Sequence, residues 1–502
     1  MPSNSALLPT VPTAKTNELV YLEWFMNKTT IKLPGIYKWP FWRTLVLQAG
    51  SSEPAVLHAL LALSSAHRAE SQHERLRNAV DEAFNAEEQF SLSRYCRAIT
   101  ELQPHLAAGD KASVRVALIT CAIFTCIEFL QGRYQTGLEH LRSGLKLLCT
   151  VNLYSLSSAS DTVDEWLLET FARLSLQVAL FDPSFERIPE IFQNLWTDRA
   201  SFESVPQARR NLDCLLQASL GPRNTISVNA AESHDNFRGI RPQSREQLEA
   251  ELASWHVAYS TFHGNLRSEH DPQEFFASLM LQPYHAMAVI SAGTHLDSGY
   301  SDEMAYDRYL PQFVSMIRQS ISLLRAVKPI RHYTDHLEVC HFSIDIGWIP
   351  QLYFTALKCR NNRVRLHALK LLSLHRSREG VWDTLLASAV AREVIQLEEG
   401  DFYHYWSASD GFSIMDDPGQ SDSDSKMPVL PPSRRVQQVQ VVLPNGPSDT
   451  MRLTCMRPTR DGGLELLKRE HDPRSGQWMS LERKGTSEST LSVCSIPSVA
   501  SA

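Results

Sequence analysis

The sequence predicts an all-α protein: one large multi-helix domain with a disordered linker and a small C-terminal appendage of possible β character. Two adjacent segments carry this prediction. Val116–Leu130 is almost wholly apolar, as is typical of a helix buried on every side, and Tyr134–Leu148 repeats apolar residues at intervals of four and three. Similar patterns with a period of 3.6 recur along residues 17–399, where we expect mostly helix and no sheet of more than two or three strands.

The junction between these two segments has the features of a helix end. Gln131-Gly132 ends the first helix, because glycine adopts the left-handed conformation that closes a helix without strain. In the second helix one face is apolar, and the charged residues Glu139, Arg142 and Lys146 fall on the other face. The apolar face comprises Tyr134, Leu138, Leu141, Leu145 and Leu148. A buried helix followed by an amphipathic helix that packs against it is typical of the centre of a large helical domain.

The remaining helices follow from start signals, stop signals and periodicity. Ser51-Ser52-Glu53-Pro54 is typical of a helix start, with a serine cap candidate and proline in the first turn. The pattern from Glu82 to Leu102 is expected to stop at Pro104. Prolines divide residues 160–225 into shorter pieces, and residues 221–244 are expected to form a polar loop. Further helical patterns cover Glu246–Tyr259, Phe275–Gly293, Tyr306–Val327, His336–Lys358, Arg363–Arg376 and Val381–Glu398.

Composition divides the chain into five parts. We expect a disordered leader at residues 1–16, the helical domain at 17–410, an acidic linker rich in serine and proline at 411–433, the appendage at 434–484 and a disordered tail at 485–502. In the appendage, apolar residues on both sides of a Pro-Asn-Gly turn predict one or two strands. The acidic run of the linker is more typical of a solvated connection than of an activation segment or a phosphorylation target, because it has nothing to bury.

The net charge and the cysteines argue against a DNA-gripping chain and against a disulfide-bonded protein. The 502 residues carry a formal net charge of -7, whereas a chain that grips DNA by its phosphates usually has a basic excess. The nine cysteines are scattered, form no CxxC pair and fit a reducing compartment. The N-terminus lacks the features of a signal peptide, and no apolar run is long enough for a transmembrane helix, so we expect no membrane association.

One group of residues has spacing that resembles a metal site. His332, His336 and Cys340 lie four residues apart and are followed by His341, so the first three would share one helical face. A zinc protease would need a glutamate directly after the first histidine, where this chain has Tyr333, and no partner cluster is identifiable. We therefore favour a packed helix over a zinc site here.

Catalytic motifs are absent from the sequence. His58 and His67 lie nine residues apart and would point to different sides of a helix, so we interpret them as packed or surface histidines. No GxSxG elbow, P-loop or GxGxxG after a strand occurs. We predict no catalytic, cofactor-binding or metal-binding residues, and no cofactor.

Basic residues form only short clusters. Arg360, Arg363 and Arg365 share a helical face only in part, so we expect a solvated helix end rather than a DNA-binding surface. Arg434-Arg435 is expected in a flexible segment, where the pair could serve nuclear import although it is a short signal.

Four segments carry a resemblance to a known family. They are the run from Leu118 to Leu148, Glu53–Ala59 with Ala62–His67, Tyr95–Leu102, and Lys358–Glu399 with its Lys-Cys-Arg, Glu-Gly-Val-Trp and Glu-Glu motifs. In order and number they resemble the central regulatory domain of fungal zinc-cluster transcription factors, over about residues 17–400.

The resemblance implies a nuclear regulator of transcription, modulating a metabolic or secondary-metabolite pathway. Full family members begin with six cysteines that hold two zinc ions, and this sequence has no such segment. The implied partners are therefore proteins, either full-length zinc-cluster regulators or a second copy, and direct DNA binding is not expected. Three explanations stay open: an upstream segment missing from the gene model, a finger-less relative that works through partners, or a helical domain recruited as a scaffold or, least favoured, an enzyme.

Overall fold

The computed structural model of the protein describes most of the helical region and the appendage. The described residues are 16–75, 82–150, 162–185, 201–220, 244–266, 271–294, 303–334, 342–374, 376–404, 412–419, 428–446, 448–459 and 461–481. The expected leader (apart from Thr16), the expected tail and nearly all of the expected loop at residues 221–244 lie outside them.

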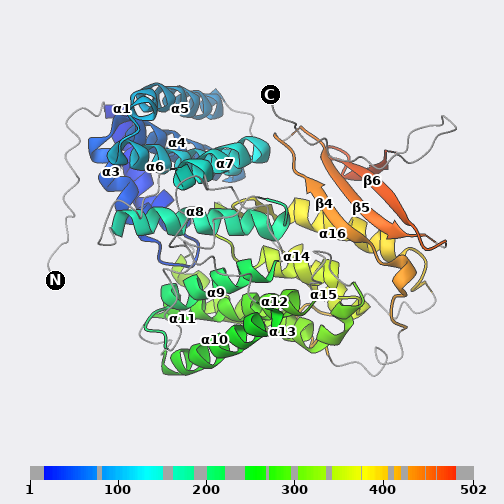
Figure 1. The fold of residues 1–502 in the computed structure, drawn as a ribbon. Helices are drawn as coiled ribbons and strands as arrows, with labels where there is room; N and C mark the ends of the chain where they lie inside the picture. Colours follow the sequence, from blue (N-terminus) through cyan, green and yellow to red (C-terminus); the bar gives the residue numbers. More distant parts are fainter. Residues whose placement is uncertain are drawn as a thin grey trace, which may run out of the picture.

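A first group of helices forms the N-terminal part. Its members are α1 (Thr16–Trp24), α2 (Thr30–Lys32), α3 (Val46–Ser52), α4 (Pro54–Arg75), α5 (Glu82–Ala108), α6 (Lys111–Leu130) and α7 (Tyr134–Thr150), with π-helical turns at Phe25–Thr29 and Phe41–Leu45. The Asp110 side chain caps α6 by accepting a hydrogen bond from the Ser113 backbone N–H, and α6 ends before Gly132, whose φ is +72°. Helix α4 packs along α5, and α6 packs along α7 (Figure 1).

The second group follows in the chain after α8 (Thr162–Phe181), which lies between the two groups in Figure 1. Its members are α9 (Val205–Ser219), α10 (Arg245–Asn265), α11 (Pro272–Leu279), α12 (Leu281–Thr294), a 3-10 turn (Ala305–Tyr309), α13 (Leu310–Thr334), α14 (Ile349–Lys358), α15 (Asn362–Leu372) and α16 (Thr384–Glu399). Side-chain caps set several of these starts: Ser244 and Gln247 form a reciprocal capping box at α10, and Asp383 caps α16.

Two small sheets accompany the helices. Strands β1 (Phe342–Ser343), β2 (Arg378–Glu379) and β3 (Trp382–Asp383) form a three-stranded sheet of two residues per strand. The C-terminal appendage is a four-stranded antiparallel sheet in the order β4-β5-β6-β7, beside α16 (Figure 1). Its strands are β4 (Gln437–Val442), β5 (Met451–Pro458), β6 (Leu464–Asp472) and β7 (Gln477–Ser480), preceded by a 3-10 turn at Pro432–Arg434. The predicted fold class is confirmed, while the boundaries drawn from composition stay a proposal.

The α6–α7 pair is the core that the sequence predicted. Nearly every residue of α6 from Val116 to Leu130 is buried, and on α7 the side chains of Leu141, Leu145 and Leu148 are buried as well. Two glycines on α7 permit this close packing. A Cβ on Gly137 would lie 2.6 Å from the Phe129 ring, and a Cβ on Gly144 would lie 2.3 Å from the Phe171 ring. Glycine at these positions is therefore a packing requirement that apolar periodicity does not reveal.

The structure corrects four helix boundaries. Ser51 and Ser52 lie in the last turn of α3, so they do not cap α4, which begins at Pro54. Pro104 lies inside α5, which continues to Ala108 although the proline removes one backbone hydrogen bond. The expected helix Phe275–Gly293 is divided into α11 and α12.

The fourth correction concerns the expected helix His336–Lys358. Residues 342–343 instead pair with β2 as strand β1, and helix α14 begins only at Ile349. Pro350 stands in the first turn of α14, where its fixed φ favours a helix start and its missing N–H costs nothing. Residues 335–341 lie outside the described part of the chain.

Two helical stretches among the described residues are long and apolar enough to cross a membrane by length and composition alone, Lys111–Leu130 and Pro272–Thr294. In their most apolar windows, 89% and 67% of the residues are buried inside the protein. Such burial is typical of core helices in a folded domain.

Candidate functional site

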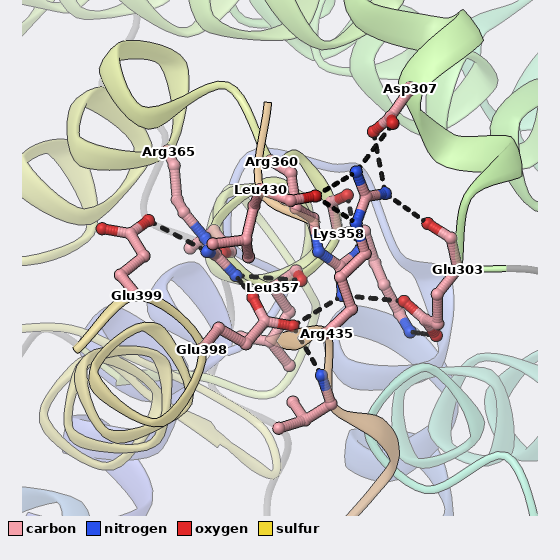
Figure 2. A network of polar contacts seen from close by, with 12 residues as sticks. Glu303, Asp307, Leu357, Lys358, Arg360, Arg365, Glu398, Glu399, Leu430 and Arg435 are labelled. Carbon is pink, nitrogen blue, oxygen red and sulfur yellow. Dashed lines mark hydrogen bonds and ion pairs between the residues drawn. The ribbon is translucent and has the colours of Figure 1, made fainter. Parts of the chain in front are cut away.

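Two arginines at the α14–α15 turn are buried, which corrects the expectation of a solvated helix end. Arg360 is 4% exposed and Arg365 is 0% exposed. They are buried because carboxylates from distant parts of the chain surround them (Figure 2). Arg363, between them, points elsewhere and donates a hydrogen bond to the backbone carbonyl of Asp417 at 3.4 Å.

Glu398, near the end of α16, is the centre of this arrangement. One of its oxygens pairs with Arg365, and the other accepts hydrogen bonds from Arg360 Nη2 at 2.8 Å and from the Val436 backbone N–H at 2.9 Å. Arg365 also donates to Glu399 at 3.0 Å. A single carboxylate therefore joins α14–α15 to the segment that leads into β4.

A second set of contacts fixes the same segment from the other side. Arg435 donates both terminal nitrogens to the Asp307 carboxylate, at 2.9 and 2.7 Å, and Nη1 to the Glu303 carbonyl at 2.8 Å. It also donates to the Leu430 carbonyl at 3.0 Å from Nε. The Glu303 side chain pairs with Lys358 at 2.6 Å. Arg435 thus ties residues 430–436 to the turn before α13.

These contacts form one unit, which we call the ionic cluster. Its members are Glu303, Asp307, Lys358, Arg360, Arg365, Glu398, Glu399 and Arg435. Arg360 Nη2 lies 2.8 Å from both Glu303 and Glu398, so it connects the two halves. Four cations face four carboxylates, which offsets the large cost of burying charge.

The electrostatic environment keeps Glu398 and Lys358 ionised near neutral pH. Burial alone would raise the pKa of Glu398, but Arg365 and Arg360 lower it below its ordinary value. Burial would lower the pKa of Lys358, but Glu303 raises it above its ordinary value. Compensated charges of this kind position chain segments rather than activate a substrate.

The burial of Arg435 also corrects the expectation that Arg434-Arg435 lies in a flexible basic segment. Arg435 is 0% exposed, because its guanidinium is enclosed by Asp307 and three backbone carbonyl contacts. Arg434 is part-exposed and pairs with Asp401 at 3.0 Å. The pair is therefore used to hold the appendage on the helical body.

A second buried group of charges lies where α8 and α9 meet the loop before α14. Arg209 donates two hydrogen bonds to Asp345, both at 2.6 Å, and its guanidinium lies 3.7 Å from the centroid of the Tyr37 ring. Arg173 on α8 lies over the Trp39 ring and pairs with Glu169 at 2.5 Å. The first and second groups of helices are joined through these residues.

Of the histidines and cysteines named from the sequence, the structure describes the side chain of His67 but not those of the metal-like group. His67 is buried, its Nδ1 lies 2.9 Å from the Thr29 hydroxyl, and burial lowers its pKa to about 4, as fits a packed histidine. The metal-like group His332, His336, Cys340 and His341 lies outside the side chains that the structure describes. Among the described residues, no group of three or more His, Cys, Asp or Glu is arranged to hold a metal ion.

Most of the ionic cluster was missed by sequence reasoning. Glu303 and Asp307 belong to no motif in the sequence, and Glu398 belongs only to the Glu-Glu pair of the family resemblance. Their meeting with Arg360, Arg365 and Arg435 gives them a role. The available signal was weak: Glu398-Glu399 ends an apolar helical pattern, where a charge on the packed side calls for a partner.

The fold and the two buried charge groups define a helical body whose segments are held together by internal ion pairs. Comparison with known proteins finds a family domain in part of the chain. Residues 22–180 match the fungal-specific transcription factor domain. This part of the chain is therefore similar to a domain of fungal transcription factors.

Two curated relatives carry the name of transcription regulators. Over 478 residues the chain is 22% identical to the aspercryptin biosynthesis cluster-specific transcription regulator atnN of Emericella nidulans, covering 79% of this chain and 76% of that protein. Over 110 residues it is 29% identical to the transcription regulator lscL of Purpureocillium lilacinum, covering 20% of this chain and 25% of that protein. No solved structure matches the chain.

Proposed function

We propose that this transcription regulator controls a group of secondary-metabolite biosynthesis genes. The observation that carries the proposal is the similarity to a biosynthesis cluster-specific regulator along 79% of the chain, a share much larger than the family domain at residues 22–180. Deleting the gene in its source fungus and measuring all transcripts under producing conditions tests this. We expect a coordinated change in one set of neighbouring biosynthetic genes, and no such set would contradict the proposal.

We propose further that the 502-residue chain acts through protein partners, either full-length zinc-cluster regulators or a second copy. Two features support this: the formal net charge is -7, and the sequence has no CxxC pair. Three of its arginines, Arg360, Arg365 and Arg435, are also committed to internal ion pairs and cannot meet phosphates.

A DNA titration of the purified chain at several salt concentrations, with zinc analysis of the same sample, tests the partner-dependent mechanism. We expect weak, sequence-independent binding near physiological salt and no stoichiometric zinc. Sequence-specific binding tighter than about 1 µM would contradict it.

We infer a nuclear location and no catalytic activity from the transcriptional role. A fluorescent fusion should accumulate in nuclei. Because Arg435 is enclosed, we expect Arg434→Gln to leave this accumulation unchanged. Exclusion of the wild-type fusion from nuclei would favour the alternative, a helical interaction scaffold unrelated to transcription.

A further inference from the structure

Residues 412–419 precede the appendage and lie against α13 and α15, where the sequence predicted only a solvated linker. The acidic end of this segment is held by Arg318 on α13, whose guanidinium donates three hydrogen bonds of 2.9 to 3.1 Å to the Asp417 carboxylate. Arg325, two turns further along α13, donates to the Met415 carbonyl at 3.2 Å. The carboxylate of Asp417 has therefore found a cationic partner, while Ile414 and Met415 beside it pack against the hydrophobic core.

The other end of the segment is held through an aromatic ring. Lys370 Nζ on α15 lies 3.7 Å from the centroid of the Phe412 ring and donates to the Phe412 carbonyl at 3.2 Å. The Arg363 guanidinium lies 5.3 Å from the same centroid. The His367 ring lies 4.6 Å from it, and His367 Nε2 is 3.3 Å from the Ile414 carbonyl. A cation over an aromatic ring is attracted electrostatically to the negative face of the ring.

These contacts define a basic face made of Arg318, Arg325, Arg363, His367 and Lys370 on α13 and α15. The basic face binds two side chains of the segment that lie five residues apart. They are the aromatic ring of Phe412 and the carboxylate of Asp417. It also contacts several backbone groups of the segment, which any peptide supplies. The bound segment therefore shows directly which ligand chemistry the face accepts.

The ion pair at the acidic end of the segment is weak enough to exchange. The side chains of Arg318 and Asp417 are 53% and 32% exposed, and an ion pair in such surroundings contributes little to stability. By contrast, the ionic cluster is almost fully buried. Tethering in the same chain raises the effective concentration of the segment, so a weak contact stays occupied until a competitor arrives.

We propose that the basic face is a binding site for an acidic peptide of a partner protein, with an aromatic residue about five positions before the acid, and that residues 412–419 occupy it in cis. The chain's own segment and the partner segment compete for the same cations. This inference concerns a binding surface and does not rest on which genes the protein controls.

The test measures binding of a fluorescent peptide with the sequence of residues 412–419 to the full chain by anisotropy. In the double variant Phe412→Ala/Asp417→Asn the cis segment is weakened, so we expect the peptide to bind at least about tenfold more tightly than to the wild type. Adding Arg318→Gln and Lys370→Gln to this variant should remove that gain. Adding Arg245→Gln instead, an exposed arginine paired with Glu249 on α10, should leave it intact.

Circular dichroism and melting of each variant establish that the fold is retained. The proposal is overturned if the folded double variant binds the peptide no better than the wild type. It is equally overturned if loss of Arg318 and Lys370 leaves binding unchanged, or if a peptide with Asp416 and Asp417 replaced by asparagine binds as tightly as the original.

Discussion

The α6–α7 pair and the ionic cluster are both buried, but they are held by different physics. In α6–α7 the packed side chains are almost all apolar, and the attraction has no preferred direction. In the cluster, Arg360, Arg365 and Glu398 are equally inaccessible, and each depends on a particular opposite charge. An apolar core accepts another residue of similar volume, whereas a buried ion pair is damaged by the loss of either partner.

The largest expected effect comes from Glu398→Gln. This change removes the charge that Arg360 and Arg365 both face, and leaves two buried cations partly uncompensated. We expect a loss of about 3–5 kcal/mol in the free energy of unfolding, measured by denaturant titration followed by circular dichroism. The matched control is Glu249→Gln on α10, an exposed partner of Arg245, which should change stability by no more than about 0.5 kcal/mol. Equal effects of the two substitutions would mean that the cluster is not under electrostatic control.

The apolar region should respond to volume instead of charge. Leu145 is 0% exposed on the packed face of α7. We expect Leu145→Ala to cost about 2–5 kcal/mol, because it leaves a cavity, and Leu145→Met to cost less than about 1.5 kcal/mol. The same denaturant titration checks both, and a methionine variant as unstable as the alanine variant would contradict a volume-controlled core.

On acidification, the first helix group should lose stability at a higher pH than the ionic cluster. The folded pKa of His67 is about 4, below the ordinary value of about 6.5, so its neutral form stabilises the first helix group at high pH. That contribution, roughly 3 kcal/mol, is complete above pH 6.5 and is lost as the pH falls through 6.5 towards 4. The pKa of Glu398 is also lowered, so its contribution is lost only below its ordinary value of 4.5.

Melting temperatures measured between pH 8 and pH 4 check this order of events. We expect His67→Gln, which can keep a hydrogen bond to Thr29, to flatten the decline between pH 6.5 and pH 4.5. An unchanged decline in that variant would mean that another group causes it.

The smallest effect concerns thiol chemistry in the apolar region. Burial raises the pKa of Cys121 to about 12 and raises that of Cys126 well above its ordinary value, so both should react slowly with thiol reagents in the folded protein. Cys96 on α5 is exposed and serves as the internal control. Labelling followed by mass spectrometry should modify Cys96 first; modification of Cys121 or Cys126 at the same rate would show that the α6–α7 core opens readily.

The contrast between the apolar α6–α7 pair and the ionic cluster explains why the sequence predicted the first and not the second. Helix α6 follows from a continuous apolar run and helix α7 from spacings of three and four residues, and both patterns are visible in a short window of the sequence. Arg435 and Glu303 lie 132 residues apart, and no local pattern connects them. Arg360 and Arg365 looked like solvated residues, because the sequence shows their charge but not their partners. The docking of residues 412–419 was missed for the same reason.

The central claim is that the ionic cluster is the main attachment of the C-terminal sheet to the helical body, beside the hydrogen bonds that Gln135 and Thr136 at the start of α7 make to Leu443 and Asn445. Hydrogen exchange of the full chain, read by mass spectrometry, tests it with Arg435→Gln and the neighbouring control Arg434→Gln, whose side chain is part-exposed. We predict that Arg435→Gln speeds exchange in residues 430–443 and β5, while α6 and α7 keep wild-type protection and Arg434→Gln changes little. Unchanged exchange in the sheet, or a loss of protection that spreads into α6 and α7, would contradict the claim.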